Sequence, residues 1–280
     1  MPFVHQRYGK ANVRVLRLHR QGDYHEVREV RVKVTLEGDF TRAYTDADNA
    51  PVVTTDKMKN LVQVLALEHF AIANEPFALA IAQCFLERYM HVSQALVEIE
   101  ETPWGRMQIN GKPHDHCFVK AEGGTPFAAV TATRSSRDMV AGIRDFAIMK
   151  TTQSGFVGYV QDEYTTLPET TDRILATRLQ ATWHFSHDQL TDYAAVTEAI
   201  RAALLHVFAT TYSASVQDSV YRMGEAALAA APDVYEITLS MPNIHYLTIN
   251  LSHFGLETQE QLFLPTDEPN GHIEATMRRA

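Results

Sequence analysis

Residues 30–37 read VRVKVTLE, so that apolar side chains alternate with polar ones along the whole stretch. A period of two is typical of a strand with one buried and one solvated face, as in antiparallel sheets. Residues 13–18 form the predicted partner strand, and Gln21-Gly22-Asp23 between them is typical of a turn. The pattern therefore predicts an antiparallel hairpin near the start of the chain.

Two helices are predicted after the hairpin. Residues 56–72 carry apolar side chains at three- and four-residue spacing, which indicates an amphipathic helix. Pro76 suits a first helical turn, and a second helix is expected over residues 77–91. Further strands are predicted at residues 95–100, 116–120 and 127–133.

The second half of the chain repeats this order. It predicts strands at 144–151 and 177–186, helices at about 191–208 and 216–230, and strands at 235–241 and 245–251. We expect an α+β fold of two tandem units, 1–137 and 138–280, divided in the polar stretch 134–138. Open antiparallel sheets leave unpaired edges, and closure into a barrel by oligomerisation would pair them.

Composition excludes several classes of protein. The chain has 280 residues and a net charge of −9, from 25 basic and 34 acidic side chains, which disfavours a broad nucleic-acid-binding surface. Two cysteines are too few for a disulfide framework and favour a reducing compartment. The N-terminus lacks the apolar centre of a secretory signal, and the most apolar run, 76–86, is too short to span a bilayer. We expect a cytoplasmic protein.

The sequence lacks the common cofactor motifs. It contains no G-x-G-x-x-G dinucleotide loop, no G-x-x-x-x-G-K-[ST] phosphate loop, no H-E-x-x-H and no C-x-x-C. The strongest candidate for a metal site is His114-Asp115-His116-Cys117, because two histidines two positions apart share one face of a strand. A polar start of a strand with a half-buried cysteine explains the same residues and is the favoured interpretation.

Two other segments could carry chemistry. Asn243 and His245 share a strand face and could hold a small polar molecule and move protons, although a core histidine explains the pattern as well. A long polar loop from Thr151 onward contains Phe156 and ends near Arg173. An aromatic face and a planar guanidinium suit a flat, anionic heterocycle, and a solvated loop is the alternative.

The starts of two predicted helices offer further groups. Thr54-Thr55-Asp56 and Ser215-Val216-Gln217 are ordinary N-cap sequences. The same backbone N–H groups could also donate to an electron-rich ligand, with the Gln217 amide beside them.

In their order and spacing, these segments closely resemble the urate oxidase (uricase) family over nearly the whole chain. Each is a weak motif alone, and the set is specific. It comprises Tyr8-Gly9-Lys10, Thr55-Asp56 with Lys59-Asn60, 150–156 (KTTQSGF), 162–168 (DEYTTLP), Asp172-Arg173, Ser215-Val216-Gln217 and 242–246 (PNIHY).

The resemblance implies a tunnelling fold, in which each chain has two tandem ββααββ units and four chains close their sheets into a barrel-like tunnel. It implies active sites between the subunits of this homotetramer. It also implies oxidation of urate by O₂ and water to 5-hydroxyisourate and hydrogen peroxide, with neither a metal nor an organic cofactor, because the electron-rich urate itself supplies the electrons.

The resemblance further implies which residues bind urate. Arg173 would form a bidentate pair with one edge of the anion, and Gln217 with the backbone of Val216 would bind the opposite edge. Phe156 would stack on the purine plane.

The remaining roles concern oxygen and protons. Thr55 and Asp56 of a neighbouring subunit would contact the imidazole-ring side, Asp56 through its backbone. Asn243 would hold O₂, and later water, above the ring. Lys10, Thr55 and His245 would form a proton relay that deprotonates urate and activates water.

Two alternatives remain open at this point. A metal-dependent relative of the same fold, similar to GTP cyclohydrolase, would use Cys117 and a histidine, but the residues expected to anchor a pterin are missing. A non-catalytic purine-binding tetramer would not need the intact set of Lys10, Thr55 and His245. The C-terminal residues 277–280 lack the S-K-L address of many eukaryotic relatives, in line with a cytoplasmic location.

Overall fold

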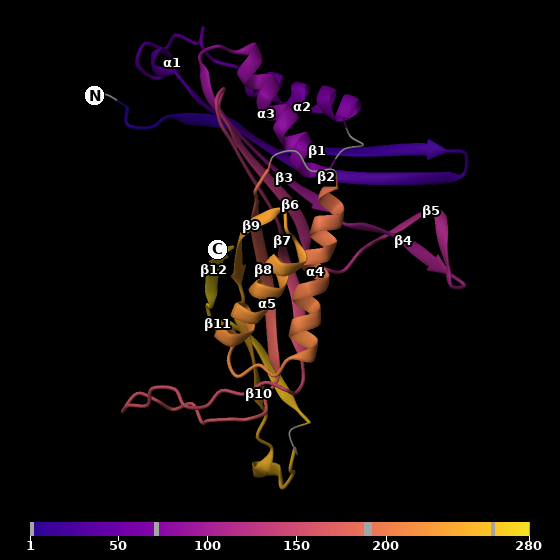
Figure 1. Cartoon of the computed structure of the whole chain (residues 1–280), viewed down its shortest axis with the longest axis vertical. Coiled ribbons are helices and arrows are strands. Elements are labelled where there is room, and N and C mark those ends of the chain that lie inside the picture. Colours follow the sequence, from indigo (N-terminus) through magenta and orange to yellow (C-terminus); the bar gives the residue numbers. More distant parts are fainter. Residues whose placement is uncertain (1–2, 70–72, 188–191, 259–260, 280) are drawn as a thin grey trace. The chain divides into compact units, whose positions relative to one another are not determined.

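The computed structural model describes residues 3–69, 73–187, 192–258 and 261–279. The chain forms two compact units, Met1–Gly142 with His184–Ala194 and Ile143–Trp183 with Ala195–Ala280 (Figure 1). Among the described residues, no helix is long and apolar enough to cross a membrane.

The first unit begins with the predicted hairpin. Strands β1 (Arg7–Gln21) and β2 (Tyr24–Gly38) pair antiparallel along almost their full length, and Gly22 takes a φ of 62° in the turn. The apolar positions of the alternating stretch are buried: Val32, Val34 and Leu36. β2 pairs antiparallel with β3 (Val92–Thr102), which pairs with β6 (Thr125–Ala132). The alternation therefore predicted both the strand and its inward face.

The helices of this unit follow their predicted positions. Helix α2 (Thr55–His69) packs against β1, and α3 (Asn74–Arg88) packs against β3 and β6. Residues 70–72 of the first predicted helix lie outside the described residues. The short helix α1 (Thr41–Thr45) was not predicted, since it has no buried side chain that would produce a periodic pattern.

A separate two-stranded sheet was only half predicted. It pairs β4 (Trp104–Ile109) with β5 (Lys112–Lys120). The sequence indicated the strand at 116–120 but not its partner, because β4 is largely exposed and lacks an apolar alternation.

The second unit contains all or most of six elements near their predicted positions: strands β7 (Arg137–Lys150), β8 (Leu175–Phe185), β9 (Val234–Ser240) and β10 (Asn243–Thr248), and helices α4 (Tyr193–Thr210) and α5 (Val216–Ala230). Residue 191, the first residue of the helix predicted at about 191–208, lies outside the described residues. The unit also contains the short 3₁₀ helix η1 (Ser252–Phe254) and two strands that were not predicted, β11 (Phe263–Gly271) and β12 (Glu274–Arg278).

The strands of the second unit follow the order β7-β8-β10-β11, and β9 pairs with both β8 and β12. α5 packs against β9 and β12. Its Gly224 makes room for Met277 of β12, because an added Cβ would lie 2.0 Å from the terminal methyl carbon of that side chain. Both units therefore combine antiparallel strands with a helix pair, as the α+β prediction expected.

Candidate active site

Lys10 lies where β1 departs from regular pairing with β2. The register shifts between Lys10 and Val13, and Asn12 has a φ of 57° within this bulge. Bulges of this kind turn a side chain away from the regular alternation of the strand. Just before it, Gly9 approaches β2 so closely that a Cβ would lie 1.9 Å from the Val34 carbonyl oxygen. The Lys10 side chain is half-buried.

The start of α2 is fastened to the same strand by Tyr8. Its hydroxyl donates to the Val53 carbonyl at 3.0 Å and accepts from the Val53 N–H at 2.8 Å. Burial raises the pKa of Tyr8, and the bond to Val53 opposes part of that shift. Thr54 is the N-cap, since its hydroxyl accepts from the Lys57 N–H at 3.2 Å. Thr55 therefore begins the helix with an exposed side chain.

The Asp56 carboxylate is already engaged within the first turns of α2. It accepts from the Lys59 ammonium at 2.6 Å and from the Asn60 amide at 3.0 Å. The bond to Lys59 is the main reason that the pKa of Asp56 is lowered, and the charge of Lys10 adds to the effect. The first N–H groups of a helix have no partner within the helix, and the backbone contact expected for Asp56 stays a prediction.

In the second unit, Arg173 and Phe156 lie together. The guanidinium carbon is 5.3 Å from the centre of the ring. Burial lowers the pKa of Arg173, and its Nε is buried without a hydrogen-bond partner in the described part of the chain. A buried donor without a partner costs free energy, and an acceptor atom at this place would offset that cost.

Backbone bonds hold this loop in place. Phe156 exchanges two hydrogen bonds with Thr170, at 2.7 and 3.1 Å, and the Arg173 N–H donates to the Ser154 carbonyl at 2.8 Å. The Gly155 N–H donates to the Ser213 carbonyl at 2.9 Å. The irregular loop between β7 and β8 (Figure 1) is thereby fixed to the segment that precedes α5.

α5 begins where this segment ends. The Ser215 hydroxyl accepts from the Asp218 N–H at 3.0 Å and forms the N-cap. In the first turn, Val216 is buried and the Gln217 side chain is exposed. The helix that carries Gln217 therefore starts three residues after Ser213, whose backbone is bonded to Gln153 and Gly155 of the loop.

Asn243 and His245 lie two residues apart on β10, as predicted. Asn243 is opposite Gly271 on one side and Thr177 on the other, and His245 is opposite Thr266. Both side chains are half-buried. The register between β10 and β11 shifts between these two positions. The Asn243–Gly271 pair therefore lies outside the regular pairing that begins at His245.

The predicted residues thus fall into two sets. Lys10, Thr55 and Asp56 belong to the first unit, and the other six, Phe156, Arg173, Val216, Gln217, Asn243 and His245, belong to the second. Sequence reasoning missed Tyr159, whose ring stacks on Phe156 at 4.7 Å with the planes 12° apart. The only signal in the sequence was an aromatic residue three positions from Phe156.

Comparison with known proteins gives consistent matches. The family model described as Uricase matches residues 6–131 and 139–274. The chain belongs to the uricase family. It is 38% identical to a uricase from Oryctolagus cuniculus, covering 99% of this chain and 94% of that protein. It is 37% identical to the crystal structure of uricase from Arthrobacter globiformis, with a TM-score of 0.93, covering 100% of this chain and 95% of that one.

Membership of the uricase family identifies the chain as an oxidoreductase that acts on urate with O₂. It also confirms the tunnelling fold expected from the motifs, because the likeness to uricase structures extends over the whole chain. The matches to uricases disfavour the metal-dependent pterin enzyme that the sequence left open.

Proposed function

We propose that this uricase binds urate against Phe156 and Arg173 and oxidises it without a metal or organic cofactor. The observation that carries the proposal is the buried Nε of Arg173, which has no hydrogen-bond partner in the described chain and lies beside an aromatic ring. A flat anion with adjacent acceptor atoms satisfies the guanidinium fork and stacks on the ring at once.

The other binding residues complete the recognition of a purine. Gln217 offers an amide donor and acceptor, and the Val216 N–H at the start of α5 offers a further donor. Tyr159 covers one face of the Phe156 ring, so the ligand stacks on the other. Thr55 and the backbone of Asp56, from a neighbouring subunit, bind the imidazole side of urate.

In the proposed reaction the protein moves protons, and urate itself supplies the electrons. Lys10, Thr55 and His245 pass a proton from urate, and the more electron-rich anion donates electrons to O₂ held by Asn243. The relay then activates water, which adds to the oxidised ring. Urate, O₂ and H₂O give 5-hydroxyisourate and H₂O₂, which balances atoms and electrons.

We propose that the active enzyme is a homotetramer with its sites between subunits. This arrangement is supported by the distribution of the two residue sets over the two units of the chain. A neighbouring chain would supply Thr55 and Asp56 to the urate held by Arg173. Pairing of exposed sheet edges between chains would close the barrel.

The location that we propose is the cytoplasm. Both cysteines, Cys84 and Cys117, are free thiols, a state typical of a reducing compartment. Localisation of the tagged protein in its own host cells tests this proposal.

The test of the mechanism follows urate loss by near-ultraviolet absorbance and peroxide formation in parallel, on metal-stripped protein with chelator present. We expect equal amounts of urate consumed and peroxide formed. Lys10→Met and His245→Ala should each lower kcat by about 10²–10⁴-fold, the usual contribution of a positioned acid or base. Activity that returns only with added metal would contradict cofactor independence.

Matched variants control for the loss of charge and of an imidazole. Lys57→Met removes an exposed lysine from the first turn of α2, and His272→Ala removes an exposed histidine between β11 and β12. Both should retain the activity of the unchanged protein. Equal rates in the relay variants and in these controls would rule out the relay.

A further inference from the structure

The hairpin of β4 and β5 contains an irregularity that the urate site does not use. Arg106 pairs with Phe118 and Gln108 pairs with Pro113, so that the single residue Met107 faces the four residues 114–117. Extra residues on one strand break the alternation of side chains and re-aim them. These four residues are the His114-Asp115-His116-Cys117 segment singled out in the sequence.

Arg106 holds this bulge in shape. Its guanidinium donates to the carbonyls of His114 at 3.2 Å and of Asp115 at 2.7 Å, and to the carbonyl of His25 on β2 at 2.5 Å. The same group lies 3.8 Å from the centre of the Tyr24 ring. The carbonyls that lost their partners in the hairpin are thereby satisfied, and the bulge is tied to β2.

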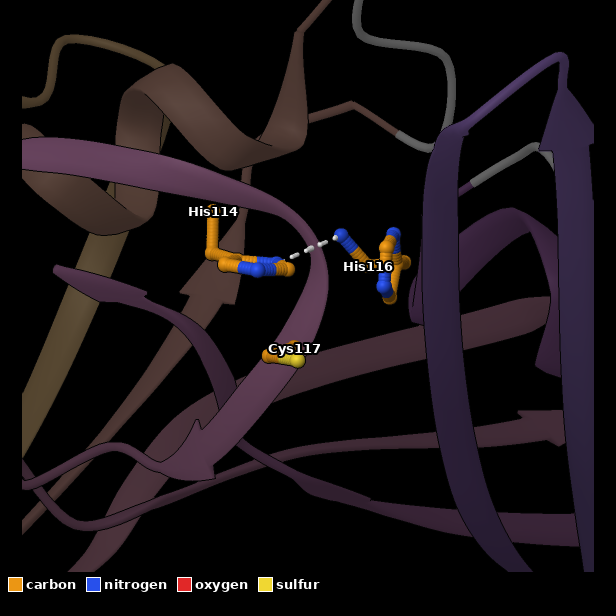
Figure 2. A group of neighbouring side chains, drawn as sticks. All are labelled: His114, His116 and Cys117. Carbon is orange, nitrogen blue, oxygen red and sulfur yellow. Dashed lines mark hydrogen bonds between the residues drawn. The ribbon is translucent and has the colours of Figure 1, made fainter. Parts of the chain in front are cut away.

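The bulge brings three metal-binding side chains together. One ligand atom each of His114, His116 and Cys117 lies within 4.8 Å of the others, and Figure 2 shows all three on this short stretch of β5. The two imidazole rings are 4.7 Å apart. The ring of His25 is a further 5.7 Å from that of His116. On a regular strand, Cys117 would point away from both histidines.

We propose that His114, His116 and Cys117 bind one Zn²⁺, with His25 or water as the fourth ligand. Two imidazoles and a thiolate are preferred ligands of this ion, and bond lengths of about 2.0–2.3 Å place tetrahedral ligands roughly 3.3–3.7 Å apart. Side-chain rotations that move the ligand atoms by about an ångström bring them from within 4.8 Å of one another to this spacing. Cys117 is half-buried, and His116 is exposed, so the ion has a path from solvent.

Binding exchanges protons in a defined way. The Cys117 thiol loses its proton to solvent as the Zn–S bond forms. In the metal-free protein, Nδ1 of His114 accepts a long bond of 3.3 Å from the His116 N–H (Figure 2). Coordination replaces this weak bond, and the proton of the neutral ring resides on the nitrogen that does not bind zinc.

The site is separate from urate oxidation. None of its residues belongs to the two sets that bind urate or move protons. Zinc bound here joins the bulge of β5 to β2 when His25 is the fourth ligand, so its effect is on the stability of the hairpin and on access to the Cys117 thiol.

The experiment titrates the metal-stripped full-length protein with zinc chloride by calorimetry, in buffers with different heats of ionisation. We expect one ion bound per chain, with about one proton released from the thiol. Zinc should also protect Cys117 from alkylation, read by mass spectrometry, while Cys84 reacts as before. Cobalt in place of zinc should give the near-ultraviolet absorption of a thiolate–metal bond.

Variants assign the ligands. Cys117→Ser and His116→Ala should raise the Kd for zinc at least tenfold, since even groups outside the ligand shell change metal affinity by about 10–100-fold. Cys84→Ser is the matched control, because Cys84 is also half-buried and accepts a bond from Arg88 at 3.2 Å. Urate turnover should remain unchanged in all three.

Three results would overturn the proposal. They are the absence of zinc binding by the unchanged protein, equal affinity in Cys117→Ser and Cys84→Ser, and a cobalt spectrum without the thiolate band. The cobalt and alkylation measurements use the unchanged protein, so they decide the question even where a variant folds poorly. None of them depends on the urate reaction, and the two proposals therefore fail separately.

Discussion

The guanidinium carbon of Arg173 lies 5.3 Å from the centre of the Phe156 ring, and no carboxylate among the described residues forms an ion pair with it. The guanidinium thus contacts an aromatic ring, and the Arg173 backbone is fixed by its N–H bond to the Ser154 carbonyl. Burial lowers the pKa of Arg173 because it disfavours the charged form, so holding the cation there lowers the stability of the fold. An anionic ligand would recover that cost.

Replacement of Arg173 should therefore weaken urate binding. We expect Arg173→Gln to raise KM for urate by about 10–100-fold, because a hydrogen bond to a charged group contributes about 1.5–3 kcal/mol. The KM of Arg173→Lys should lie between those of the unchanged protein and Arg173→Gln, since lysine keeps the charge without the planar guanidinium. Steady-state kinetics measure both, with the exposed Arg178→Lys as control. A KM unchanged in Arg173→Gln would contradict the assigned role.

Gly155 should not tolerate a side chain. An added Cβ would lie 2.2 Å from the Tyr212 hydroxyl and 3.0 Å from the Thr170 carbonyl oxygen. Gly155→Ala should lower the free energy of unfolding by about 1–3 kcal/mol, the usual cost of overpacking. It should also raise KM, because Phe156 follows directly. Adding Tyr212→Phe removes the closest of these contacts and should restore part of the loss in denaturant unfolding, and no restoration would argue against the steric cause.

The Tyr8 hydroxyl should matter for catalysis although it is distant in sequence from α2. It makes two hydrogen bonds to Val53, just before the helix that carries Thr55. Tyr8→Phe leaves both Val53 groups without this partner and should cost about 1–3 kcal/mol of stability. We expect kcat to fall with little change in KM. Tyr44→Phe, in the exposed helix α1, is the control, and equal kinetics of the two variants would exclude a positioning role.

Stability should depend on pH through Glu75. Burial in the first turn of α3 raises the pKa of this carboxyl from 4.5 to about 7, against the weaker attraction of Arg28. Below pH 4.5, both the folded and unfolded chains hold the proton. As pH rises toward 7, the unfolded chain loses its proton first, so the free energy of unfolding falls across this window.

The variant Glu75→Gln stays neutral and should escape this loss. At pH 8 it should be more stable than the unchanged protein by up to about 3 kcal/mol, at about 1.4 kcal/mol per pKa unit. The advantage should disappear near pH 4.5. Urea unfolding at several pH values measures it, with Glu87→Gln at the exposed end of α3 as control. A difference that does not vary with pH would refute the account.

The sequence by itself determined the regular elements and the family. The alternation at 30–37 and the three- and four-residue spacing in 56–72 are local patterns, and burial of one face decides them without knowledge of the partner. The order of short motifs from Tyr8 to Tyr246 then identified the uricase family, which the comparisons confirm. No measure of burial or geometry was needed for that step.

Only the tertiary structure decided which side chains meet. β11 was missed because its sequence, with Pro265 and Pro269, lacks a strand pattern and takes its form from pairing with β10. The engagement of Tyr8 with Val53 and the aromatic partner of Arg173 depend on contacts between distant segments. The four-residue bulge of β5 depends on register. Register and packing arise from many long-range contacts at once, and the spacing of residues along the chain does not encode them.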